Sequence, residues 1–160
     1  GSRHEERFEK PGSIAVASWD RDRLVGVHLA HGDVEGWLTT KPFRLRGLAV
    51  VLNVDTQLAC SSVTVEVLDE ENTPFAGFGH ESAIPLRGQS GGTRALAHWA
   101  EAGASLPRRL LGRRVKLRFT LRGAAKLYGF ALASNVSAPR RQRRRSHLQP
   151  SAPAPLEGVS

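Results

Sequence analysis

Two tryptophans stand close to acidic residues, in an arrangement that can bind sugar. Trp19 is followed by Asp20, and Trp37 lies two residues after Glu35. The flat face of an indole packs against the C–H face of a pyranose ring, while neighbouring polar groups bond to its hydroxyl groups. These four residues are the candidate ligand-binding residues. Core packing is the competing interpretation for any large aromatic side chain, and it applies most to Trp99.

The sequence indicates no catalytic residue, cofactor or metal site. Glycoside hydrolysis needs two carboxyl groups roughly 5–10 Å apart in one cleft, whereas acid pairs such as Asp33 and Glu35 resemble turn residues. Cys60 is the only cysteine, which excludes an internal disulfide, and the sequence places no base beside it. His28 and His31 are three residues apart in an extended segment, so they point to opposite faces and suit zinc poorly.

An arginine cluster near the C-terminal end offers a different chemistry. It consists of Arg140, Arg141, Arg143, Arg144 and Arg145. Residues 133–160 hold these five arginines and one acid, so they carry +4 of the formal net charge of +8. Such a cluster can bind a polyanion or nucleic acid, or act as a nuclear import signal. The rest of the chain is only mildly basic and does not indicate a nucleic-acid-binding domain.

The elements that must position these residues are predicted to be strands. Apolar residues alternate with polar ones at 23–30, 61–68 and 115–121, which predicts half-buried strands. The almost continuously apolar run 48–54 predicts a strand covered on both faces. Further strands are expected at 14–17, 36–40 and 126–132, a strand in preference to a short helix at 95–101, and an irregular Gly-rich loop with at most one short strand at 75–93. The strand at 114–122 also projects a basic stripe of Arg114, Lys116, Arg118 and Arg122, which is either a binding surface for a phosphate backbone or acidic glycan or a solvated face.

These elements predict an all-β fold, an antiparallel two-sheet sandwich of the concanavalin or jelly-roll type. With 160 residues, 40% of them hydrophobic, the chain has room for one domain. We expect a linker or tag remnant at 1–12, the sandwich at 13–132 and a disordered Arg- and Pro-rich tail at 133–160. No apolar run is long enough to predict a membrane span. The chain starts Gly1-Ser2 and contains no methionine, so we expect a piece of a longer protein.

Seven short motifs occur in an order that resembles one known module. They are GSIAVA at 12–17, RDRLV at 21–25, LTTKPF at 38–43, LNVD at 52–55, VTVEVLD at 63–69, RRVKLRFTL at 113–121 and KLYGF at 126–130. Their order resembles the C-terminal β-sandwich module of bacterial proteins that begin with a five-bladed propeller of the family 32 glycoside hydrolase and sialidase-like kind. The resemblance covers about residues 12–132.

The resemblance implies a sandwich that packs beside an upstream carbohydrate-active propeller. It implies no catalytic residue in this chain, because the catalytic carboxylates of such enzymes belong to the propeller. The sequence departs from the family pattern at 75–89 and 106–109, where the family is more acidic. A ligand preference that the family associates with the 75–89 loop is therefore not assigned to this chain.

We therefore expect a non-catalytic accessory domain of a larger carbohydrate-active protein, which packs against a partner domain and binds glycan. The alternative is polyanion or nucleic-acid binding through the arginine cluster. If the sequon at Asn135 is glycosylated, it indicates an extracellular protein. If the arginine cluster acts as an import signal, it indicates a nuclear protein.

Overall fold

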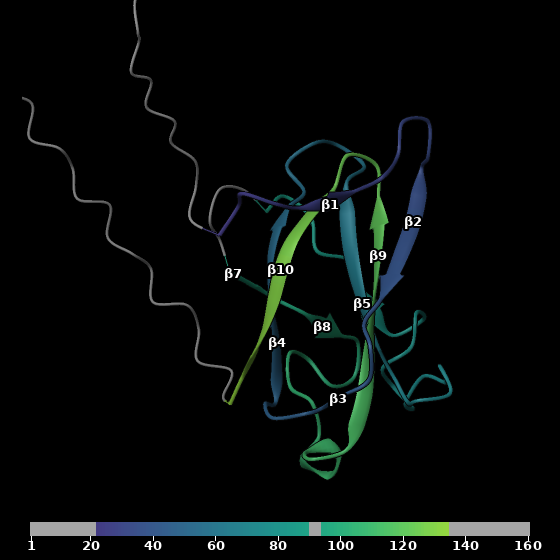
Figure 1. Cartoon of the computed structure of the whole chain (residues 1–160), viewed down its shortest axis with the longest axis vertical. Helices are drawn as coiled ribbons and strands as arrows, with labels where there is room; N and C mark the ends of the chain where they lie inside the picture. The colour runs from purple at the N-terminus through teal and green to yellow at the C-terminus, as the bar shows by residue number, and fades with distance from the viewer. Residues whose placement is uncertain (1–21, 90–93, 135–160) are drawn as a thin grey trace, which may run out of the picture.

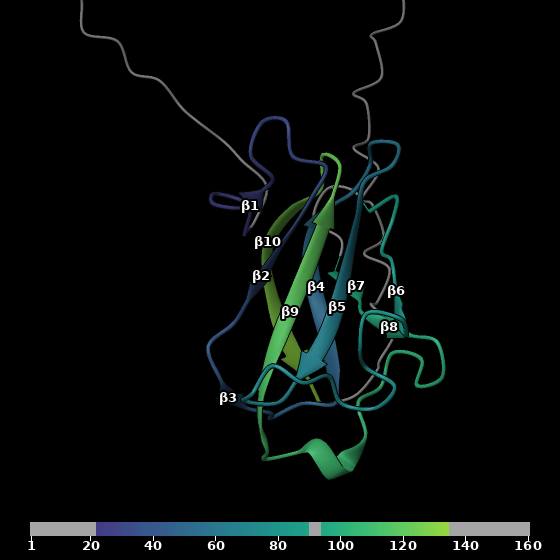
Figure 2. The ribbon, with the colours of Figure 1, turned by 90° about the vertical axis from the view of Figure 1, so that its right-hand side faces the viewer.

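The computed structural model describes residues 22–89 and 94–134, and the regular secondary structure of this part of the chain consists of antiparallel strands and one short 3-10 helix (Arg108–Leu110). Two sheets lie face to face, as Figures 1 and 2 show. The predicted all-β sandwich is confirmed. The predicted linker at 1–12, the strand at 14–17 and the tail beyond residue 134 lie outside the described residues. No helix in the described ranges is long and apolar enough to cross a membrane.

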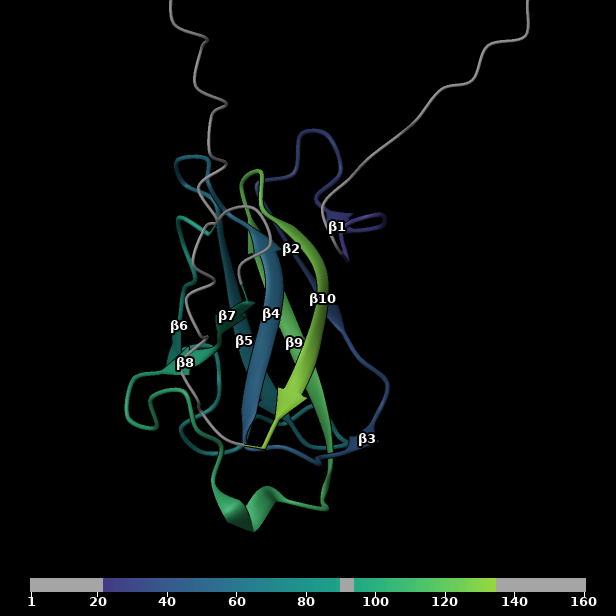
Figure 3. The same ribbon diagram turned by 90° about the vertical axis from the view of Figure 1, so that its left-hand side faces the viewer.

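The first sheet, here named the β4 sheet, has the strand order β1-β10-β4-β7. Its strands are β1 (Val27–His28), β10 (Lys126–Ala133), β4 (Ala49–Asp55) and β7 (Arg94–Leu96). In Figure 3 this sheet faces the viewer. β4 buries Val50, Leu52 and Val54 against the other sheet, while alternate residues such as Val51 are only partly covered. The prediction that this strand is covered on both faces is therefore only partly correct.

The second sheet, named the β9 sheet, has β9 at its centre. Its strands are β2 (Glu35–Thr39), β3 (Phe43–Arg44), β5 (Ser62–Leu68) and β9 (Arg114–Arg122). β9 pairs with β2 and β3 along one edge and with β5 along the other. The inward residues of β9 include Leu117, Phe119 and Leu121, all fully or almost fully buried. Because side chains alternate between faces, the residues between them point away from the core.

The tryptophan predicted to pack in the core does so. Trp99 belongs to β8 (His98–Trp99), which pairs with β6 (Ala83–Ile84) beside the two large sheets. Its indole is completely buried and lies edge-on to Phe78, with ring centroids 5.1 Å apart. The indole N–H donates a hydrogen bond of 2.9 Å to the backbone oxygen of Val65. A buried tryptophan needs such a partner for its polar nitrogen.

The strand predicted to be half-buried at 61–68 is buried on both faces. Every residue of β5 is buried, including the outward-facing Ser62 and Glu66. The reason is the irregular segment 74–89, which runs along the free edge of β5. Phe78 accepts a hydrogen bond from the Val67 amide at 2.9 Å, and Leu86 exchanges two hydrogen bonds with Val63. The predicted loop at 75–93 thus holds one short strand, β6, and forms an added edge of the β9 sheet.

Of the strand predicted at 23–30, only the two residues of β1 (Val27–His28) form a strand in the structure. Val25 and Val27 were expected to face the core, yet they are 77% and 51% exposed. Of the apolar residues on the predicted face, Leu29 packs against the core, and polar contacts hold the start of the segment. Arg23 donates hydrogen bonds to the Asn53 side chain and to the Val54 backbone oxygen, and its guanidinium lies 4.7 Å from the ring centroid of Tyr128.

Replacing Trp99 by alanine should lower the free energy of unfolding by about 3–5 kcal/mol, because a fully buried indole leaves a large cavity. Replacing Trp37, which is 70% exposed, should cost less than about 1 kcal/mol. Urea denaturation of the two variants measures both values. Equal losses would show that the two tryptophans do not have the different environments described above.

Candidate functional site

The outer face of the β9 sheet carries a row of side chains that crosses three strands. The register pairs Trp37 of β2 with Thr120 of β9, and Thr120 with Thr64 of β5. The neighbouring residue Phe119 is fully buried in the core, so these three side chains point outward. Side chains directly opposite each other in antiparallel strands have Cβ atoms about 4.5–5.5 Å apart. The exposed indole and the two threonines therefore form one continuous strip.

A second row runs parallel to the first. It pairs Glu35 with Arg122 and Arg122 with Ser62. The Arg122 Nε–H donates a hydrogen bond to Glu35 Oε2, which forms an ion pair between two partly exposed side chains. Ser62 itself is almost completely buried at the end of this row.

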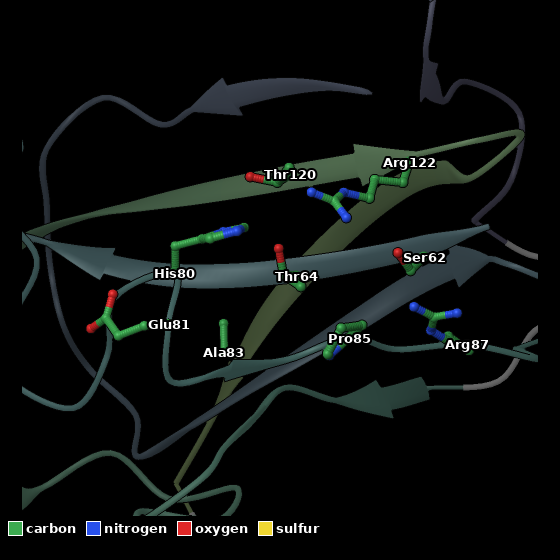
Figure 4. A pocket seen from close by; sticks show the side chains of 9 residues that line it. All are labelled: Ser62, Thr64, His80, Glu81, Ala83, Pro85, Arg87, Thr120 and Arg122. Atoms are coloured by element: carbon green, nitrogen blue, oxygen red, sulfur yellow. The ribbon is translucent and has the colours of Figure 1, made fainter. Parts of the chain in front are cut away.

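The segment after β6 extends this second row beyond β5. The antiparallel bridge between Val63 and Leu86 places the residue after Leu86 opposite the residue before Val63. Arg87 and Ser62 therefore share the outer face. Figure 4 shows Arg87 and Arg122 at the same end of the site, on opposite sides of Ser62.

Together these elements enclose a pocket of about 290 Å³, named here the Thr64 pocket. Ser62, Thr64 and Thr120 form its floor, and His80 and Glu81 lie at the end opposite the arginines (Figure 4). Ala83 and Pro85 complete its wall. The volume is at the lower end of the roughly 300–1,000 Å³ of small-molecule sites. The pocket therefore has room only for a small ligand or for part of a larger one.

The hydroxyl group of Thr64 has an unusual environment. Thr64 is only 8% exposed, and its Oγ1 is the one buried side-chain polar atom in the described part of the chain without a hydrogen-bond partner. By contrast, Oγ1 of the buried Thr56 accepts a hydrogen bond of 3.0 Å from the Gln89 amide. An unpaired buried polar group costs about 1–3 kcal/mol. The Thr64 hydroxyl has no bond to the protein to give up, but its oxygen is itself buried, so a ligand bonds to it only after the side chains around it move.

The predicted site residues divide into two groups. Trp37 and Glu35 lie two residues apart on the outer face of β2, which places both beside the floor of the Thr64 pocket. Trp37 does not pack in the core, in contrast to Trp99. Trp19, Asp20 and the arginine cluster lie outside the described residues.

None of the nine pocket residues is among the residues that the sequence predicts to bind sugar, and Arg122 enters the sequence analysis only as part of the basic stripe. Ser62 and Thr64 alternate with valines in β5, and Thr120 and Arg122 occupy the equivalent positions in β9. This alternation correctly predicts that they face away from the core. It does not show that β5 and β9 pair, nor that the 74–89 segment turns their shared outer face into a pocket.

The basic stripe of β9 is balanced by acidic and polar groups. Besides the Arg122–Glu35 pair, Arg114 lies 2.9 Å from Glu70, Arg118 lies 3.9 Å from Glu66, and Lys116 donates to the Glu70 backbone oxygen and to Asn72. Each cation of the stripe therefore has a protein partner. This arrangement disfavours the stripe as a continuous binding surface for phosphates.

Within the described ranges, no group of three or more His, Cys, Asp or Glu side chains is placed to hold a metal ion. Cys60 is exposed and adopts a positive φ of 66° in the turn before β5. No protein-family model, curated protein sequence or solved structure matches this chain. The resemblance to the propeller-associated module therefore stays a prediction.

Replacing Thr64 by valine should leave the free energy of unfolding unchanged or raise it by up to about 1 kcal/mol, because an unpaired hydroxyl becomes a methyl group. The matched control Thr56→Val removes the acceptor of the Gln89 amide and should lower that free energy by about 1 kcal/mol. Chemical denaturation of both variants gives the comparison. A clear loss of stability in Thr64→Val would mean that its hydroxyl has a structural partner.

Proposed function

We propose that this domain is a non-catalytic accessory β-sandwich of a larger carbohydrate-active protein, and that it binds glycan on the outer face of the β9 sheet. One observation carries the proposal. The exposed indole of Trp37 lies in the same row as the buried, unpartnered hydroxyl group of Thr64, with Thr120 between them.

This row matches the two kinds of surface that a sugar presents. The indole offers a flat apolar face to the ring C–H groups, and the threonine hydroxyls offer hydrogen bonds to the ring hydroxyls. Two inter-strand spacings of about 4.8 Å separate Trp37 from Thr64, or about 10 Å in all. One short saccharide can therefore contact the indole and enter the Thr64 pocket.

The acidic groups of the outer face support a binding role over a catalytic one. Glu35 is engaged by Arg122, and the buried Glu66 lies next to Arg118. Glu35 and Glu66 thus each have an arginine partner, and the pocket lining contains one carboxylate, Glu81, whereas a glycosidase holds two carboxyl groups facing each other across the scissile bond. The sandwich fold also agrees with the fold that the resemblance implies, and such modules have their catalytic carboxylates in the propeller.

Replacing Trp37 by alanine should weaken glycan binding by at least about tenfold, because the stacking surface is lost while the fold is kept. Binding is measured first on a glycan array and then by titration calorimetry with the best ligand. The control is Leu111→Ala, which removes an apolar side chain of 43% exposure near the short helix (Arg108–Leu110) at the end of the sandwich. Equal binding by Trp37→Ala and the unmodified protein would contradict the proposed surface.

The alternative function is binding of a polyanion or nucleic acid through the arginine cluster. Five arginines within residues 140–145 favour it. Since the cations of β9 are paired, this function depends on the cluster. Deletion of residues 139–146 should then abolish retention on heparin, and the affinity of the intact chain should fall steeply with salt. Unchanged retention after the deletion would rule this alternative out.

A further inference from the structure

We infer that the glycan is acidic, and that Arg87 and Arg122 form a subsite for the carboxylate of a uronic acid. The two residues are called the arginine pair below. The inference rests on the proposed function, since it names the class of sugar that the same surface binds.

The arginine pair lies at one end of the Thr64 pocket. Arg122 reaches the pocket from β9 and Arg87 from the added edge beyond β5, so Ser62 lies between them in the row. Figure 4 shows both guanidinium groups on the pocket side of the sheet. The Ser62 side chain on the floor is 3% exposed and places a hydroxyl between the two cations.

The charges of the arginine pair are only partly compensated. Glu35 engages Nε of Arg122, which leaves the two terminal nitrogens of that guanidinium without a hydrogen bond to any described residue. The Arg87 side chain makes no hydrogen bond or ion pair with the described part of the chain. It differs in this from Arg114 and Arg118, which have acidic partners. One net positive charge therefore remains at this end of the pocket.

A carboxylate matches what the arginine pair offers. The planar guanidinium fork donates two parallel hydrogen bonds to the two oxygens of a carboxylate, and such charge-assisted bonds are among the stronger ones. Glu81 lies at the opposite end of the pocket, where its negative charge disfavours a second anion. The ligand is therefore expected to direct its acidic group toward Arg87 and Arg122.

The spacing of the two rows fits a sugar that carries its acid on the ring. Thr120 and Arg122 are two residues apart on β9, which corresponds to about 6.8 Å along the strand. A ring that bonds to Thr64 and Thr120 can therefore extend a carboxylate attached to it toward the arginine pair. A neighbouring sugar of the same chain then stacks on Trp37.

The test compares oligosaccharides of galacturonate, mannuronate and glucuronate with their methyl esters, which keep the ring and lose the charge. Titration calorimetry is done with the unmodified protein, Arg87→Gln, and Arg108→Gln as a control for the same charge change at the far end of the sandwich. We expect at least one acid to bind about tenfold or more tightly than its ester. Arg87→Gln should abolish this preference, and Arg108→Gln should keep it.

Failure of the carboxylate subsite and failure of the glycan-binding surface give different results. Equal affinity for acids and esters, with binding lost in Trp37→Ala, would overturn the carboxylate subsite and leave the glycan-binding surface intact. Absence of binding by every acidic and neutral glycan would overturn both. A preference for acids that persists in Arg87→Gln and disappears on deletion of residues 139–146 would assign the charge recognition to the arginine cluster.

Discussion

The pairing of β9 with strands on both of its edges is the constraint on which the core and the candidate site depend. Seven residue pairs join β9 to β5, and five join it to β2. In this register Phe119 and its alternate neighbours face the opposite sheet, so Thr120 and Arg122 must face outward. A shift of the register by one residue would exchange the two faces. The rows that cross β2, β9 and β5 exist only because the apolar side of each strand is fixed in the core.

The sequence predicts the strands well because their signal is local. The alternation at 115–121 and at 61–68 predicts β9 and β5 with nearly their observed bounds. The candidate site is different, because its rows join residues far apart in the chain. Trp37 and Thr120 are separated by more than eighty positions, and nothing in either segment alone indicates that they meet. The alternation thus predicts which face a residue occupies, and the sheet register determines its neighbours.

The wrong predictions have one physical cause in common. Periodicity shows which side of a strand is apolar, but it does not show what covers the other side. Ser62, Thr64 and Glu66 have the sequence of a solvated face and are buried, while Val25 and Val27 have the sequence of a core face and are exposed. In β5 the irregular segment 74–89 supplies the cover, whereas no element in the described part of the chain covers Val25 and Val27. The two described tryptophans illustrate the same point, since one residue type fills the core at Trp99 and forms an exposed surface at Trp37.

The irregular segment that forms one wall of the Thr64 pocket is attached to the rest of the domain at four places. Phe78 is bonded to β5, β6 pairs with β8, Leu86 is bonded to Val63, and Gln89 is bonded to Thr56 at the end of β4. A wall held at four places would need little change of backbone conformation to bind the proposed ligand. The surface is preorganised, so little conformational entropy is lost when it closes on a partner, and a small contact area can still give useful affinity. Selectivity of the proposed site would then depend on the distance between its opposing walls, because the backbone of the walls is held in place.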